Sequence, residues 1–251
     1  MALSFAVVCE APADRETGCG LADAVFRQSF RLPRAELEER RAWRGLEAKP
    51  DFLKWGEVYN LVKSKLHWLP RHYFHGHFKG KSALPDARVG RGAMLLLKHS
   101  ACPPDAIFLI RDDDRKTQRR EGLEQAKREA REEHGMTMPI VIGLAHPKRE
   151  AWVLACFVPQ SEAERERLEE IEKEIHFSPI KEPERLNEKH GGPRDPKRVL
   201  RVLTNDNPER EAVCWEQTDP EVLKTRGSET GLRDYLCQVE EKTVPLLNLG
   251  A

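Results

Sequence analysis

Three consecutive aspartates, Asp112, Asp113 and Asp114, follow an apolar segment that ends at Arg111. In an extended segment the side chains at positions i and i+2 point the same way, so Asp112 and Asp114 can converge while Asp113 faces elsewhere. Carboxylates held together repel one another unless a cation neutralises them. Because oxygen ligands suit Mg²⁺ or Mn²⁺ better than zinc, the spacing predicts a magnesium or manganese site. The alternative is an acidic turn in which an aspartate caps the next helix.

A further acidic residue, Glu10, stands at an equivalent place in the chain. It follows the apolar segment LSFAVVC at 3–9, just as the aspartates follow AIFLIR at 106–111. Continuous apolar runs of this kind predict strands that are covered on both faces of a parallel sheet. Ligands of an open α/β sheet bind beyond the carboxyl ends of its strands. We therefore expect Glu10 and the aspartates to share one rim of the sheet.

The elements that must position these residues alternate between strand and helix. A third strand is predicted at 139–145, and all three strands are expected to be central and parallel. Between the second and third strands, Leu123, Ala126 and Ala130 recur at helical spacing, and the segment 90–101 predicts a helix before the second strand. This order predicts an α/β fold with a mainly parallel, Rossmann-like sheet flanked by helices.

The remaining sequence is expected to elaborate this sheet within a single domain, 1–251. The first two strands are separated by more residues than one crossover needs, so 34–84 is predicted to be a mostly helical insertion. The part from about 160 to 251 is predicted to be helical, and Ser161 and Glu164 form a capping-box pattern near its start.

The composition is that of a soluble globular protein, with 251 residues of which 39% are apolar and 33% charged. Lysine plus arginine equals aspartate plus glutamate, at 42 each, so attraction to phosphates must come from local clusters. The first residues carry no basic leader, and their apolar run is too short for a signal peptide or a membrane span. We expect a cytoplasmic protein with no membrane partner.

Two basic segments are candidates for contacts with nucleic acid. One begins the helix after the aspartates, where cations oppose the helix dipole and so favour a bound anion; solvated arginines are the alternative. The other interleaves basic and aromatic residues, which suits phosphates and stacked bases, although a helical hairpin with a basic rim explains it nearly as well. The predicted contacts are Arg115, Lys116, Arg119 and Arg120 in the first segment, Lys63, Lys65, Arg71 and Lys79 in the second, and Lys148 after the third strand.

The acidic residues and their order resemble the Toprim domain of topoisomerases, primases and OLD-type nucleases. In that family a first strand ends in a glutamate, often within a Glu-Gly-x-Thr-Asp turn, and a later strand ends in Asp-x-Asp. This sequence reads CEAPAD, which places Glu10 and Asp14 at the matching positions without the usual glycine, and Asp112 and Asp114 match the Asp-x-Asp. In small stand-alone members from bacterial defence and mobile-element settings a helix starts with Glu-Ala-Trp, as it does here at Glu150.

The resemblance implies a Toprim-like fold and Mg²⁺- or Mn²⁺-dependent hydrolysis of phosphodiester bonds in DNA or RNA. The residues that it assigns to the metal site are Asp112, Asp114, Glu10 and Glu150, with Asp14 and Asp113 orienting them. Glu10 would be a ligand or a general acid/base. Glu150 would complete a second metal site, or would only stabilise the start of its helix through the helix dipole. The resemblance also implies antiviral defence with a separate ATPase or another defence-system subunit as partner.

Two other functions fit the same residues. An Asp-x-Asp at a strand end also binds Mn²⁺ and a nucleotide-sugar diphosphate in glycosyltransferases, but that function leaves Glu10 without a role. The second alternative is a catalytically silent Toprim-like adaptor that binds nucleic acid or a partner ATPase. The intact acidic residues Glu10, Asp112 and Asp114 weigh against a silent adaptor.

Overall fold

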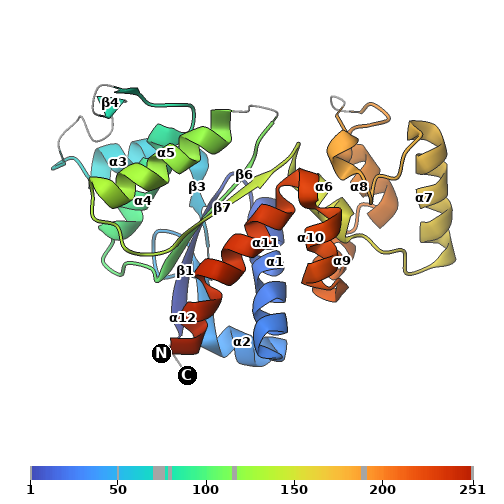
Figure 1. The fold of residues 1–251 in the computed structure, drawn as a ribbon, viewed down its shortest axis with the longest axis horizontal. Coiled ribbons are helices and arrows are strands. Elements are labelled where there is room, and N and C mark those ends of the chain that lie inside the picture. Colours follow the sequence, from blue (N-terminus) through green and yellow to red (C-terminus); the bar gives the residue numbers. More distant parts are fainter. Residues whose placement is uncertain are drawn as a thin grey trace.

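The computed structural model describes residues 2–49, 51–69, 77–78, 81–114, 118–187 and 191–249. Its centre is a parallel sheet of five strands (Figure 1). The strand β1 (Leu3–Cys9) pairs on one side with β2 (Arg41–Arg44) and β3 (Leu53–Lys54) and on the other with β6 (Ala106–Asp112), which pairs with β7 (Ile140–Ala145). Every one of these pairings is parallel, so the predicted α/β fold with a mainly parallel sheet is confirmed.

Two hydrophobic cores cover the two faces of the sheet, because successive side chains of a strand point to opposite faces. Phe5 and Val7 of β1 pack in the core that contains buried residues of α1 (Pro12–Phe30). Ala6 and Val8 pack in the other core, with buried residues of α4 (Ala87–Lys98) and α5 (Gln118–Glu132). Figure 1 shows α4 and α5 on one side of the sheet and α1 and α11 (Leu232–Lys242) on the other.

The prediction that all three apolar strands are central is wrong for β7, which ends the strand order β2-β1-β6-β7. At one position of its free edge, a side chain of α11 bonds to the strand backbone. The amide of Gln238 donates to the carbonyl oxygen of Ile142 at 3.0 Å and accepts from the N–H of Ile142 at 3.2 Å. A side-chain amide thus takes the place of a neighbouring strand at Ile142.

The prediction of a mostly helical insertion over 34–84 is also wrong in the described part of that range. The helices α2 (Arg34–Arg40) and α3 (Val58–Lys65) are present, but β2 and β3 from the same range join the main sheet. The sequence of β2, RAWR, looks too charged for a buried strand. Its arginines are buried with partners, because Arg41 pairs with Asp23 and Arg44 donates to the carbonyl oxygen of Cys102.

The described carboxyl-terminal part is helical, as the sequence predicts. The helices α8 (Pro196–Thr204), α9 (Pro208–Gln217) and α10 (Pro220–Arg226) all start with proline after an Asp or Asn whose side chain accepts a helix N–H. At the start of α7 (Glu162–Ile175), the Ser161 hydroxyl accepts from the N–H of Glu164, while the Glu164 carboxylate accepts from Gln160. In the described part of the chain, no helix is both long and apolar enough to cross a membrane.

The remaining described elements are short. Two are the helices α6 (Arg149–Cys156) and α12 (Val244–Leu249), and 3₁₀ turns lie at Trp55–Glu57, Pro183–Arg185 and Ser228–Thr230. The strand β4 (His77–Phe78) pairs with β5 (Lys81–Ser82) apart from the main sheet.

Candidate functional site

The acidic residues Glu10 and Asp112 lie at the same edge of the sheet. The strands that carry them are parallel neighbours, and Val8 of β1 is in register with Leu109 of β6. Glu10 therefore follows β1 at the rim where Asp112 ends β6. Arg111 lies between the two groups and forms an ion pair with Glu10 at 2.5 Å.

Asp112 is the most strongly perturbed carboxyl group of this rim. Its pKa is raised to about 8, chiefly by burial and in addition by the nearby carboxylates of Glu150 and Asp14. Its Oδ1 accepts a hydrogen bond of 2.6 Å from the backbone N–H of Arg149, the first residue of α6. A buried carboxyl group with acidic neighbours holds its proton near neutral pH, and a bound cation would release that proton.

Glu150, in the first turn of α6, lies beside Asp112. Only 6% of this residue is exposed, and within the described residues its Oε2 is buried without a hydrogen-bond partner. Its Oε1 lies 3.6 Å from a guanidinium nitrogen of Arg149. Asp112 accepts the N–H of Arg149, so the carboxylate that caps the start of α6 is not that of Glu150. A buried carboxylate oxygen without a donor is costly unless a ligand uses it.

Asp14 connects this group to the start of α1. Its Oδ2 accepts from the N–H of Ala11 at 3.0 Å, which closes the first turn of the helix. Burial is the largest effect on the Asp14 pKa and raises it, and the carboxylates of Glu10 and Glu150 act in the same direction. The structure therefore brings Asp14, Asp112 and Glu150 into mutual electrostatic contact.

Two buried arginines hold the remaining acids of the rim. Arg111 pairs with Asp86 at 3.0 Å as well as with Glu10, and its guanidinium lies 4.6 Å from the centre of the Trp55 ring. Arg119 pairs with Asp114 at 3.0 Å and donates to the backbone carbonyl of Asp112. The side chain of Arg119 is only 7% exposed. The predicted nucleic-acid contact Arg119 is therefore a buried residue that positions the aspartate turn.

Asp113 faces away from Asp112, as the alternation of an extended segment predicts. Its Oδ2 lies 2.7 Å from Nδ1 of His146, which comes directly after β7. Nothing in the sequence singles out His146, because a histidine after an apolar strand is common and its partner lies 33 residues away. The same side of the rim contains Arg120, which pairs with Asp234 at 3.1 Å.

Of the other predicted nucleic-acid contacts, three lie among the described residues, and two of these lie away from the acidic rim. Lys63 and Lys65 are exposed on α3, and Lys65 lines a hollow together with Ser100 and Cys102, which lie ahead of the amino end of β6. Lys148, half-buried, is the residue before α6 and lies close to the acids. Arg71, Lys79, Arg115 and Lys116 lie outside the described residues.

The fit of a metal ion depends on how many carboxylates it needs from the protein. Among the described residues, no three His, Cys, Asp or Glu side chains are arranged so that they could hold an ion. Mg²⁺ commonly takes only one or two carboxylates and completes its shell with water and substrate phosphate. For that smaller requirement the candidates are Asp112, which is buried, and Glu150, whose Oε2 has no hydrogen-bond partner among the described residues.

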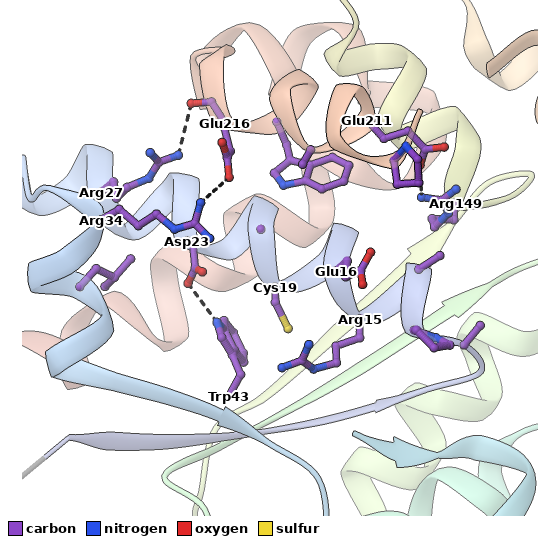
Figure 2. Close-up of a pocket in the computed structure, with 18 of the residues that line it drawn as sticks. Arg15, Glu16, Cys19, Asp23, Arg27, Arg34, Trp43, Arg149, Glu211 and Glu216 are labelled. Carbon is purple, nitrogen blue, oxygen red and sulfur yellow. Dashed lines mark hydrogen bonds and ion pairs between the residues drawn. The ribbon is translucent and has the colours of Figure 1, made fainter. Parts of the chain in front are cut away.

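A pocket opens beside the acidic residues along α1 (Figure 2). Arg149 stands at its border, where its guanidinium donates to Glu211 at 2.8 Å and to the hydroxyl of Thr17 at 3.0 Å. Ala11, the residue after Glu10, also lines the pocket. The acidic rim and the pocket are therefore neighbours.

Comparison with known proteins gives no relative for this chain: no protein-family model, curated protein or solved structure matches it. The fold and the site define an α/β protein with a buried acidic group at the carboxyl edge of its parallel sheet.

Proposed function

We propose that the protein is a Mg²⁺- or Mn²⁺-dependent phosphodiesterase that hydrolyses DNA or RNA. The observation that supports this most is the buried carboxyl pair of Asp112 and Glu150, in which one oxygen of Glu150 has no donor among the described residues. A structural ion pair would have given that oxygen a partner. A divalent cation supplies one and removes the repulsion between the carboxylates.

In this proposal Asp112 and Glu150 would hold the metal ion, which would supply Lewis-acid stabilisation of charge on the phosphate. Asp14 orients the start of α1 against Asp112, since its carboxylate is used by the N–H of Ala11. Glu10 and Asp114 are held by Arg111 and Arg119 at the same rim. Glu10 is 43% exposed there and so is the acid available to move a proton to or from the substrate.

The order of acids along the chain supports the phosphodiesterase over the alternatives. The resemblance to Toprim nucleases accounts for Glu10, Asp112 and Asp114 together, whereas a glycosyltransferase accounts only for the Asp-x-Asp. On the same basis we propose that a separate ATPase or another defence-system subunit is the partner of this chain.

The test is cleavage of supercoiled plasmid, single-stranded DNA and RNA by the pure protein in Mg²⁺, Mn²⁺ or EDTA. Asp112→Asn and Glu150→Gln should each lower the rate at least ~100-fold, because each removes several kcal/mol of charge stabilisation. Asp105→Asn is the matched control, since Asp105 accepts from Ser4 at the opposite, amino end of the strands. Cleavage that persists in EDTA or in both site variants would refute the proposal. Hydrolysis of a nucleotide sugar without cleavage would favour the transferase.

A further inference from the structure

The pocket beside the acidic rim has the size of a ligand site. Its volume is about 750 Å³, within the range of roughly 300–1,000 Å³ for small-molecule pockets. It runs between α1, α2, β2 and α9, and it starts at Ala11 and Arg149, which adjoin Glu10 and Glu150 in the chain. A ligand in this pocket would reach the acidic rim at one end.

Arg15 is the arginine of this pocket whose side chain has no partner among the residues that the structure describes. Its Nε is buried without a hydrogen-bond partner, and among the described residues its side chain forms no hydrogen bond or ion pair. Figure 2 shows its guanidinium on the side of α1 that carries Cys19, facing Trp43. The other lining arginines are engaged: Arg41 with Asp23, Arg34 with Glu216, Arg149 with Glu211, and Arg27 with the carbonyl of Glu216.

Part of the pocket lining is apolar. It is formed by Pro12 and Ala13 of α1, Leu37 of α2, and Ala212 and Trp215 of α9, and the rest of the lining is mainly charged. A guanidinium without an ion-pair partner among the described residues, in a pocket with an apolar wall, suits a ligand with one anionic group on a flat or apolar body. A free inorganic anion would leave these walls uncovered.

We propose that this pocket binds one nucleotide unit of single-stranded nucleic acid, with a phosphate on Arg15 and the sugar and base along the apolar wall. The inference names the substrate of the proposed phosphodiesterase and rests on that function for its connection to cleavage. A base enters an enclosed pocket only after it leaves the helical stack, which costs little in a single strand. The nucleotide in the pocket would stand next to the phosphate at the acidic rim.

The test measures binding of adenosine monophosphate by calorimetry in EDTA, where no metal-dependent cleavage occurs, with adenosine and inorganic phosphate as comparison ligands. Arg15→Gln should weaken binding of the monophosphate about tenfold or more, because it removes a charge-assisted hydrogen bond. Glu16→Gln should strengthen it about two- to fivefold, since exposed Glu16 also lines the pocket and repels the phosphate. Arg131→Gln, at an exposed position of α5, is the matched control and should change nothing.

The outcomes separate this inference from the proposed function. Saturable binding that responds to Arg15→Gln and Glu16→Gln in opposite directions supports the pocket, whether or not nucleic acid is cut. No saturable binding, equal binding of adenosine, or no response to either variant overturns it. If the protein cuts duplex faster than single strands, and Arg15→Gln cuts like wild type, the pocket inference fails while the phosphodiesterase stands.

Discussion

The backbone N–H of Arg149 donates a 2.6 Å hydrogen bond to Oδ1 of Asp112, and this bond joins the last residue of β6 to the first turn of α6. The bond shows which carboxylate accepts a backbone N–H at the start of α6. Asp112 takes that place, and Glu150 remains beside it, buried, with Oε2 unpartnered among the described residues. Burial, together with the nearby carboxylates of Glu150 and Asp14, raises the pKa of Asp112, whereas this hydrogen bond lowers it.

Asp112→Asn should remove a pH-dependent loss of stability. The folded pKa of about 8 exceeds the ordinary value of 3.8, so the folded protein keeps a proton that the unfolded chain loses. The free energy of unfolding therefore falls as pH rises from about 4 to about 8. Asparagine still accepts the N–H of Arg149 and carries no charge. In EDTA the variant should melt near the wild-type temperature at pH 5 and several degrees higher at pH 8, since about 1 kcal/mol corresponds to ~2–4 °C in a chain of this size.

Thermal melts of both proteins across this pH range test that expectation. A difference in melting temperature that stays constant from pH 5 to pH 8 would contradict the raised pKa of Asp112.

Mn²⁺ should stabilise the protein at pH 8, because an ion that binds only the folded state adds its binding free energy to stability. Glu150→Gln should abolish most of this increase in melting temperature, since a neutral amide is a poorer ligand than a carboxylate. Glu170→Gln, at an exposed position of α7, is the matched control. The measurement is a Mn²⁺ titration followed by thermal unfolding. Equal stabilisation of both variants would remove Glu150 from the site.

Arg111→Gln should destabilise the fold by roughly 3–5 kcal/mol, because it breaks a buried ion pair and leaves Asp86 without one of its cations. The substitution also removes the contact with the Trp55 ring. The comparison is Arg34→Gln, whose ion pairs are exposed and worth at most about 1 kcal/mol. Urea unfolding measures both. If Arg111→Gln lowers the free energy of unfolding no more than Arg34→Gln does, the ion pairs of Arg111 do not stabilise the rim.

Gln238→Ala should expose the edge of β7. It removes two hydrogen bonds to the backbone of Ile142 and should cost about 1–3 kcal/mol, the penalty for unsatisfied buried groups. Hydrogen exchange of the Ile142 amide should accelerate more than that of Phe108 in the central strand β6. Glu241→Ala, exposed on the same helix, is the control. Unchanged protection of Ile142 would count against the role given to Gln238.

The order of elements and the rim that carries the acids could be predicted from the sequence. The apolar runs at 3–9, 106–111 and 139–145 differ by at most one residue at either end from β1, β6 and β7, because strands buried on both faces must be continuously apolar. Parallel pairing of such strands then places Glu10 and Asp112 at one edge. The helices of the carboxyl-terminal part follow from local signals too, as Asp195 before Pro196 illustrates.

Partners that depend on distance in space could not be predicted in this way. The sequence does not predict the strand β2, because its arginines can be buried only when Asp23 and the carbonyl of Cys102 lie beside them. The burial of Arg119, the capping of β7 by Gln238 and the pocket around Arg15 likewise combine segments far apart in the chain. The sequence by itself determined a parallel sheet with an acidic edge. Only the tertiary structure decided which acids form close ion pairs with arginine and which are buried with a raised pKa, because desolvation and ion pairing are set by packing and not by the order of residues.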